Sequence, residues 1–257
     1  MSGLLEGKVA IVTGAAGGIG RATSLRFAAE GASVVLVDLP SLALEDALKA
    51  VQDAGGSAIA APADVSRAPE VEGYVAMAVK RFGGVDVLFN NAGIEGHIGS
   101  MLTYPEETFD RVIGVNLKGV WLGMRAVVPR MRQRGGGAII NTSSIAGLRG
   151  SAQLFAYNAS KHAVIGMTRS AALEFGRDHI RINAIAPGPV YTRMMRSLER
   201  GANPDAPEDA RKAFETRAPL QRYADPSEIA ALVTFLCSDE ASYISGAVYP
   251  IDGGYTA

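Results

Sequence analysis

The chain has 257 residues, of which 48% are hydrophobic and 20% charged, so it can bury a large core and disorder is not expected. Its 25 basic and 26 acidic residues give a net charge of −1 without a basic block, which argues against nucleic acid as a partner. The sequence has no apolar run long enough to cross a bilayer, residues 1–8 lack the apolar segment of a signal peptide, and the single cysteine, Cys237, excludes an intramolecular disulfide. We therefore expect a cytoplasmic protein without a membrane partner.

Short β-branched runs alternate with longer helical stretches along the chain. The runs expected to form buried strands are 9–13, 33–38, 85–90, 138–142, 180–186 and 248–252, with a weaker one near 57–61. The stretches expected to form helices are 18–30, 42–54, 69–82, 106–134, 155–175 and 226–238. This alternation predicts an α/β fold with a doubly wound parallel sheet, because right-handed crossovers place helices on both faces. No Pro- or Gly-rich linker divides the chain, so we expect one Rossmann domain over 1–257.

One long segment interrupts the alternation. Residues 188–225 contain no expected strand, and 201–210 (GANPDAPEDA) are rich in Pro, Ala and acidic residues. Connections of this length are usually functional lids or disordered. Since the segment follows the strand at 180–186, it should rise over the carboxyl edge of the sheet, where ligands bind in such folds. We expect a substrate lid at about 188–225.

A glycine-rich turn, TGAAGGIG at 13–20, joins the first expected strand to the first expected helix. Gly14 permits a tight turn, Gly18 lets the backbone approach a pyrophosphate, and Gly20 lets the helix pack close to the strand. The helix N-terminus offers free N–H groups and a positive dipole end to phosphate. The spacing is G-x-x-x-G-x-G rather than the commoner G-x-G-x-x-G, and such a turn can be purely structural. Together with the acid discussed next, it predicts a dinucleotide site.

Asp38 ends the second expected strand, eighteen residues after Gly20. A carboxylate there accepts hydrogen bonds from both ribose hydroxyls and repels a 2′-phosphate, which favours NAD over NADP. The alternative is an acid that caps a turn or a helix. Gly17 and Leu39 occupy the positions where a basic residue would receive a 2′-phosphate, and neither is charged. The sequence therefore predicts NAD as the cofactor.

Eight motifs in order resemble those of the short-chain dehydrogenase/reductase family, in its single-domain branch of about 250 residues. They are TGAAGGIG (13–20), ADV (63–65), NNAG (90–93), Asn116 in VNLKG, Ser144 in NTSS, YNASK (157–161), PGPVYT (187–192) and IDGG (251–254). Each motif is weak alone, but eight in the right order over essentially the whole chain make coincidence negligible. The resemblance implies hydride transfer between an alcohol or ketone and a nicotinamide cofactor.

The resemblance also implies which residues bind the cofactor. Asp64 and Val65 would hold the adenine ring, with turn capping as the equal alternative for Asp64. Residues 91–93 would cap the fourth strand against the ribose, and Thr192 would bond the nicotinamide carboxamide. The implied cofactor set is Gly14, Gly17, Gly18, Ile19, Gly20, Asp38, Asp64, Val65, Asn91, Ala92, Gly93, Tyr157, Lys161, Pro187, Gly188, Val190 and Thr192.

Tyr157 and Lys161 are four residues apart, so they lie on one face of a helix. A free tyrosine has a pKa of about 10 and is a poor base at neutral pH, but the ammonium and the positive nicotinamide of the oxidised cofactor have the sign of charge that lowers it. An isolated Tyr-x-x-x-Lys pair would instead be ordinary helix surface. In this setting we expect Tyr157 to be the acid–base of alcohol oxidation, while Lys161, by the resemblance, also bonds the ribose.

Ser144 and Asn116 complete the expected catalytic set. Ser144 follows the strand at 138–142, thirteen residues before Tyr157, and its hydroxyl can bond the substrate oxygen; Ser143 competes for this role. Asn116 lies in the middle of an expected helix, where Asn is mildly unfavourable. The resemblance implies that it holds a water beside the lysine, and a structural hydrogen bond is the alternative.

Substrate contacts are expected beside the catalytic residues and at the start of the lid. Besides Ser144, the candidates are Gln153, Met194 and Met195, with core packing as the alternative for the methionines; His97 is left open. The three histidines have no metal-ligand spacing, so no metal is expected. The lid has apolar residues, mixed charge and no arginine pair for a carboxylate, which favours a small, mainly apolar secondary alcohol or ketone, cyclic ones included.

The long helices expected at 106–134 and 155–175 carry more apolar and small residues than a one-sided surface helix needs. The resemblance implies a homotetramer in which these helices pair, with Trp121 as an interface anchor or, equally, a core residue. Other functions are less favoured: an NADPH-driven 3-oxoacyl carrier-protein reductase would need a basic residue at the ribose, a non-catalytic nucleotide-binding protein would have lost the tyrosine or lysine, and the glycine spacing argues against an epimerase or dehydratase.

Overall fold

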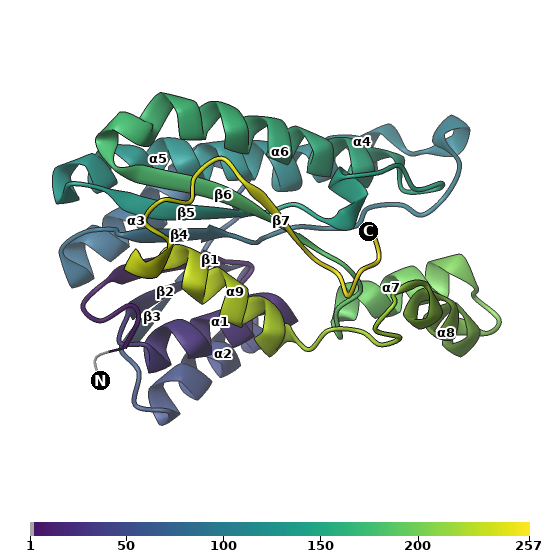
Figure 1. The fold of residues 1–257 in the computed structure, drawn as a ribbon, viewed down its shortest axis with the longest axis horizontal. Coiled ribbons are helices and arrows are strands. Elements are labelled where there is room, and N and C mark those ends of the chain that lie inside the picture. The colour runs from purple at the N-terminus through teal and green to yellow at the C-terminus, as the bar shows by residue number, and fades with distance from the viewer. Residues whose placement is uncertain (1–2) are drawn as a thin grey trace.

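Seven parallel strands form one sheet in the computed structural model, which describes residues 3–257 (Figure 1). In chain order they are β1 (Val9–Thr13), β2 (Ser33–Asp38), β3 (Ala58–Pro62), β4 (Val87–Asn90), β5 (Gly137–Thr142), β6 (Ile180–Pro187) and β7 (Val248–Ile251). Their order across the sheet is β3-β2-β1-β4-β5-β6-β7, and every neighbouring pair is parallel. The order reverses at β1 and β4, so the sheet is doubly wound and the predicted single-domain Rossmann fold is confirmed.

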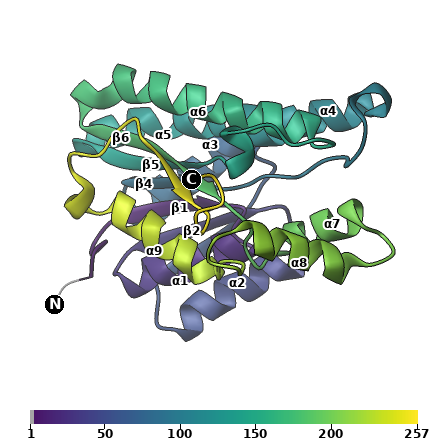
Figure 2. The ribbon, with the colours of Figure 1, turned by 45° about the vertical axis from the view of Figure 1, so that its right-hand side comes forward.

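Helices cover both faces of this sheet. In chain order they are α1 (Gly18–Ala29), α2 (Leu42–Asp53), α3 (Ala68–Phe82), α4 (Glu106–Ile113), α5 (Gly119–Arg134), α6 (Phe155–Phe175), α7 (Arg193–Ala202), α8 (Pro207–Arg217) and α9 (Pro226–Cys237). Helices α1, α2 and α9 lie on one face, and α3, α4, α5 and α6 lie on the other (Figure 1, Figure 2). Helices α7 and α8 stand beyond the end of the sheet, on the side to which β6 leads.

Each strand supplies side chains to two hydrophobic cores, one on each face. In β1, Val9 and Ile11 pack with residues of α3 and α5, whereas Ala10 and Val12 pack with residues of α1 and α9. Successive strand residues point to opposite faces, so a strand buried on both sides needs apolar residues throughout. This requirement explains why the strands stand out in the sequence as uninterrupted β-branched runs.

A chain of buried polar side chains ties together the elements that carry the catalytic residues. The Asn90 amide in β4 donates to Oδ1 of Asn141 in β5 at 2.9 Å, and the Asn141 amide donates to the Thr168 hydroxyl in α6 at 3.0 Å. All three side chains are buried. Buried polar groups that satisfy one another in this way hold neighbouring elements in a single arrangement. The ends of β4 and β5 are therefore rigidly placed against α6.

The expected element bounds agree with the structure to within two residues, with one exception of consequence. The single helix expected at 106–134 is wrong in its middle, where the π-helical turn η2 (Gly114–Lys118) separates α4 from α5. A π-helical turn accommodates an extra residue in an otherwise α-helical run and is often found at functional sites. Asn116 lies in this turn and is buried, so its unfavourable helical position has a structural cause.

The segment 188–225 contains two helices, α7 and α8, which the sequence analysis did not predict. It is anchored at both ends: Val190 pairs with Ala224 in a single parallel bridge, and the Tyr223 hydroxyl donates to the buried Glu199 carboxylate at 2.9 Å. These contacts join the beginning, the first helix and the end of the segment. The segment is therefore a folded cap rather than a long irregular loop.

Candidate active site

The glycine-rich turn fits a cofactor that approaches its backbone closely. Gly14 has φ of +67°, and a Cβ there would lie 2.9 Å from the Asn91 amide nitrogen, so only glycine is accommodated. A Cβ on Gly20 would collide with the Gly14 carbonyl, and a Cβ on Gly18 would lie 3.1 Å from Thr192 Cγ2. Helix α1 begins after Gly17 without a side-chain cap and without an acid in its first turn. Its first N–H groups are thus available to an anion such as a pyrophosphate.

Asp38 stands beside this turn at the end of β2. One carboxylate oxygen, Oδ2, accepts the backbone N–H of Ala16 at 2.9 Å, and Oδ1 accepts that of Leu39 at 2.8 Å. A carboxylate retains further acceptor capacity after two such bonds. The structure therefore brings the predicted ribose acceptor next to the predicted pyrophosphate cradle, 22 residues apart in sequence.

Asp64 and Val65 lie at the same edge of the sheet. Asp64 Oδ1 accepts both the backbone N–H and the hydroxyl of Ser66, at 2.9 and 2.7 Å, so the turn-capping role is the one that the structure displays. Val65 is buried, and a Cβ on Gly119 would lie 2.9 Å from its side chain. The predicted contact of this pair with adenine stays a prediction.

Asn91 connects the end of β4 to the glycine-rich turn. Its amide donates to the carbonyls of Thr13 and Gly14 at 3.1 and 3.3 Å, and the Thr13 hydroxyl accepts the N–H groups of Asn91 and Ala92. Gly93 faces the catalytic half of the site, because a Cβ there would lie 3.3 Å from Asn116 Oδ1 and 3.4 Å from Lys161 Nζ. Residues 91–93 therefore link the cofactor half of the site to the catalytic half.

Tyr157 and Lys161 lie on the same buried face of α6, as their spacing predicts. Both side chains are buried, and Lys161 Nζ lies 5.6 Å from the centre of the Tyr157 ring. The ammonium donates to the Thr142 carbonyl at 2.8 Å, which fixes it at the end of β5. The ammonium is thus held near the Tyr157 ring, while its hydrogen bond goes to the Thr142 carbonyl.

Of the two adjacent serines, Ser144 lies close enough to the phenol for its hydroxyl to lower the pKa of Tyr157. Ser143 is buried and donates to the backbone carbonyl of Lys161 at 2.8 Å, which is a structural role. Ser144 also begins the short turn η3 (Ile145–Gly147), where its hydroxyl accepts the N–H of Ala146. The structure thus favours Ser144 over Ser143, a choice for which the sequence offered only the spacing to Tyr157.

Asn116 clamps the loop that follows β4. Its Oδ1 accepts the Ile94 N–H at 2.8 Å, and its amide donates to the Ile94 carbonyl at 2.9 Å and to the Ser160 hydroxyl at 3.1 Å. The structural hydrogen bond, which was the alternative for this residue, is therefore observed. Because Ile94 follows Gly93, Asn116 positions the backbone beside Lys161.

Burial dominates the protonation of the catalytic pair. It raises the pKa of the Tyr157 phenol to about 12, an effect that the Ser144 hydrogen bond opposes and the negative charge of Glu95 adds to. Burial also lowers the pKa of Lys161 to about 8, so this side chain is still mainly an ammonium at neutral pH. Without a cofactor, burial therefore outweighs the groups that would lower the tyrosine pKa. A further positive charge, such as an oxidised nicotinamide, is needed to stabilise the phenolate.

The structure separates the substrate candidates. Met194 lies at the catalytic centre, with its sulfur 4.0 Å from the Tyr157 hydroxyl. Met195 donates its N–H to the hydroxyl of Thr192, which caps α7, and is half-buried. Gln153 is exposed and lines a hollow of about 600 Å³ on the outer side of α6, whereas the side chain of exposed His97 packs edge-on against Tyr104.

The remaining residues of the predicted cofactor set lie at the end of β6, just after it, and in the first turn of α1. Pro187 ends β6, and a Cβ on Gly188 would lie 2.8 Å from the backbone of Asp252, so the chain passes close to the segment after β7. Val190, at the beginning of the cap, is buried, and Ile19 is a half-buried residue of the first turn of α1. Glu95, whose negative charge raises the pKa of Tyr157, was not a candidate from sequence.

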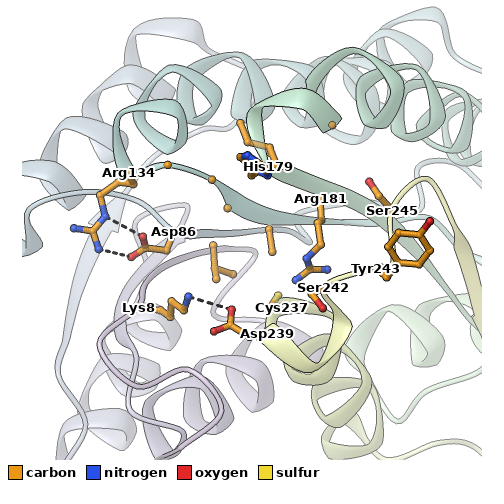
Figure 3. A pocket seen from close by; sticks show the side chains of 17 residues that line it. Lys8, Asp86, Arg134, His179, Arg181, Cys237, Asp239, Ser242, Tyr243 and Ser245 are labelled. Carbon is orange, nitrogen blue, oxygen red and sulfur yellow. Dashed lines mark hydrogen bonds and ion pairs between the residues drawn. The ribbon is translucent and has the colours of Figure 1, made fainter.

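A second cavity of about 560 Å³ lies at the opposite, amino edge of the sheet (Figure 3). Its lining includes Arg181 and two ion pairs, Lys8–Asp239 and Arg134–Asp86. None of the predicted catalytic or cofactor residues lines it, so it is separate from the site described above.

In residues 3–257, no group of three or more His, Cys, Asp or Glu is placed to hold a metal ion, and no helix is long and apolar enough to span a membrane.

Comparisons with known proteins cover nearly the whole chain. A family model described as enoyl-(acyl carrier protein) reductase matches residues 14–256. A levodione reductase from Leifsonia aquatica is 44% identical over 97% of this chain and 94% of that protein. A 3-oxoacyl-(acyl-carrier-protein) reductase from Thermotoga maritima is 42% identical over 97% and 98%, and a cyclohexanol dehydrogenase from Acinetobacter sp. is 38% identical over 100% and 98%.

Solved structures agree with these relatives. The crystal structure of levodione reductase superposes with a TM-score of 0.95 at 44% identity, covering 97% of this chain and 98% of that one. That of NAD⁺-bound xylitol dehydrogenase superposes with a TM-score of 0.92 at 37% identity, covering 97% and 99%. With the fold, the ordered motifs and these matches in agreement, the chain belongs to the short-chain dehydrogenase/reductase family of oxidoreductases.

Proposed function

We propose that the protein interconverts a small, mainly apolar secondary alcohol and its ketone, with NAD(H) as cofactor and Tyr157 as acid–base. The observation that carries this proposal is the buried Tyr157 phenol, whose pKa the neighbouring Ser144 hydroxyl lowers and whose ring centre lies 5.6 Å from Lys161 Nζ. The bound nicotinamide would supply or accept the hydride. Everything else in the reaction is proton handling and positioning, which the chain's own residues perform.

In the oxidation direction, the Tyr157 phenolate oxygen takes the proton of the substrate hydroxyl, and in reduction the phenol returns it to the ketone oxygen. Ser144 bonds the same substrate oxygen and stabilises the charge that develops on it. Lys161 keeps a positive charge near the phenolate while bonded to the Thr142 carbonyl. Asn116 holds the backbone of the facing loop in place through its two bonds to Ile94.

The residues around the glycine-rich turn fit a nicotinamide dinucleotide. The uncapped start of α1 suits the pyrophosphate, Asp38 suits the ribose hydroxyls, and Thr192 faces Gly18 across the turn. Xylitol dehydrogenase, whose solved structure holds NAD⁺, has the same fold at 37% identity. These observations support NAD rather than NADP as the cofactor of this chain.

The substrate class is supported by the apolar side of the site and by the relatives. Met194 touches the Tyr157 hydroxyl from α7, so we propose that the segment 188–225 is a lid whose methionines 194 and 195 contact the substrate. Two of the relatives are a levodione reductase and a cyclohexanol dehydrogenase, and the second name points to a hydroxyl group on a six-membered ring. We therefore favour a cyclic substrate.

The competing function is a 3-oxoacyl-(acyl-carrier-protein) reductase, which a relative at 42% identity supports. Incubating the protein with a panel of cyclic and acyclic secondary alcohols and NAD⁺, and following NADH absorbance, tests the proposal. We expect turnover of cyclohexanol and its methylated derivatives. Activity confined to acyl thioesters with NADPH would establish the competing function instead, and activity confined to linear polyols would contradict the apolar substrate class.

We also propose a homotetramer built on α5 and α6. Trp121 is 45% exposed and Leu173 is 88% exposed, so Trp121 is a surface residue and the core alternative for it is wrong. Large apolar side chains at the surface of two long helices are typical of an interface. Light scattering at micromolar concentration should give four times the mass of the chain, and replacing Leu173 by Glu should reduce it; a monomeric mass for the unmodified protein would contradict the proposal.

A further inference from the structure

Residues 252–257, which follow β7, form a compact turn at the end of the sheet where the cap stands (Figure 1). Asp252 closes this turn: its Oδ1 accepts the Gly254 N–H at 2.9 Å, and its Oδ2 accepts the N–H and the hydroxyl of Thr256 at 3.0 and 2.6 Å. The Tyr255 N–H donates to the Asp252 carbonyl at 3.2 Å. Aspartate side chains that bond nearby backbone in this way stabilise turns outside helices and strands. Tyr255 therefore stands in a defined 252–257 turn.

The 252–257 turn is joined to the cap at two places. Where the cap begins, the Gly188 N–H donates to the Ile251 carbonyl at 3.0 Å, directly before the turn. Near the end of the cap, the Leu220 N–H donates to the Gly253 carbonyl at 3.2 Å. The two segments are in close contact there, because a Cβ on Gly253 would lie 3.4 Å from Leu220 Cβ. The turn is therefore fixed relative to the cap.

The half-buried Tyr255 side chain contacts the segment that carries Ser144. The guanidinium carbon of Arg149, Cζ, lies 4.5 Å from the centre of the Tyr255 ring, which is a cation–π distance. The Arg149 N–H donates to the Ile145 carbonyl at 3.2 Å, within the short turn η3 that Ser144 begins. Arg149 is exposed and makes no ion pair with residues 3–257, so the tyrosine ring distinguishes it from a free surface arginine. The stack thus connects the 252–257 turn to η3.

We propose that Tyr255 is a positioning residue for the reaction: its stack on Arg149 holds the turn that carries Ser144 in a fixed place relative to the cap. This inference rests on the proposed function, in which Ser144 bonds the substrate oxygen. Hydrogen bonds weaken steeply with misalignment, and a misplacement of about 1 Å at a reacting centre can cost about 100-fold in rate. Tyr255 thus acts through Ser144 and does not need to touch the substrate.

The test measures oxidation of cyclohexanol by NAD⁺ in the wild type, Tyr255→Ala and Tyr255→Phe. Loss of the ring should lower kcat by about three- to tenfold, the effect of one cation–π contact, with KM and the Kd of NADH changing by less than about twofold. Tyr255→Phe keeps a ring for Arg149 and should restore most of the wild-type rate. Tyr243→Ala, at a fully exposed tyrosine on the amino edge of the sheet, is the matched control and should leave kcat unchanged.

A double-mutant cycle separates positioning from a general weakening of the structure. In Ser144→Ala the hydroxyl that Tyr255 positions is gone, so adding Tyr255→Ala should lower the residual rate by less than about twofold. If the effects of the two substitutions multiply instead, Tyr255 does not act through Ser144 and the proposal is wrong. A kcat for Tyr255→Ala equal to that of the wild type would also overturn it.

Hydrogen exchange provides a readout that does not depend on turnover. In the free protein, the amides of residues 146–149 should exchange at least about threefold faster in Tyr255→Ala than in the wild type, and Tyr243→Ala should leave them unchanged. Equal exchange in Tyr255→Ala and the wild type would overturn the positioning role. Failure of the proposed function would look different: the wild type would not oxidise the alcohol, while exchange would still report whether Tyr255 holds the turn.

Discussion

Replacing Tyr157 by Phe should lower kcat by about 10³-fold or more while leaving the affinity for NADH nearly unchanged. The buried phenol near Ser144 is the proposed acid–base group, and phenylalanine removes its oxygen while preserving the ring that packs under Lys161. Turnover followed by NADH absorbance and cofactor binding followed by NADH fluorescence would measure the two effects separately. Tyr243→Phe is the matched control, because that side chain is fully exposed at the amino edge of the sheet.

A Tyr157→Phe variant with more than a tenth of the wild-type rate would contradict the role of the phenol. The pH profile gives a second check with a definite sign. Oxidation needs the phenolate, whose formation burial opposes by raising the pKa of Tyr157 to about 12 in the protein without cofactor. Oxidation should therefore accelerate as pH rises towards the tyrosine pKa of the cofactor complex, whereas ketone reduction, which needs the phenol, should slow. Profiles that rise together in both directions would indicate a different proton donor.

NADH should be preferred over NADPH by about 100-fold in kcat/KM, and Asp38→Ala combined with Leu39→Arg should remove or reverse this preference. The reason is electrostatic: the Asp38 carboxylate lies against the glycine-rich turn through its bond to Ala16, where it repels a 2′-phosphate. The substituted arginine would supply the missing positive charge at the exposed end of β2. Initial rates with the two cofactors at a fixed ketone concentration measure the ratio.

Asp38→Asn removes the charge but keeps one acceptor, because the amide oxygen can still accept the Ala16 N–H that the carboxylate accepts at 2.9 Å, whereas the amide NH2 cannot accept the Leu39 N–H. We expect this variant to tolerate NADPH better and to be slightly less stable than the wild type in thermal unfolding. Asp46→Asn, on the exposed side of α2, is the control for an acid that is distant from the ribose. Equal rates with NADH and NADPH in the wild type would refute the argument from Asp38.

Much of this protein could be predicted from its sequence because the relevant physics is local. Strands buried on two faces must be apolar throughout, so their positions were visible as β-branched runs and their bounds differ from the structure by two residues or fewer. The four-residue spacing of Tyr157 and Lys161 places both side chains on one side of α6, because helix geometry requires it. Gly14 was likewise correctly predicted to permit a tight turn, since its φ is +67°, and Gly20 to allow close packing, since a Cβ there would collide with the Gly14 carbonyl.

Only the tertiary structure decided features that depend on contacts between distant segments. Asn116 turns towards Ile94, 22 residues away, in a π-helical turn that no propensity indicates. Ser144 rather than Ser143 meets the phenol because Ser143 is occupied by the Lys161 carbonyl, 18 residues away. Local patterns determine which residues are helical, extended or apolar, whereas the direction of a polar side chain is set by partners that only folding brings near it.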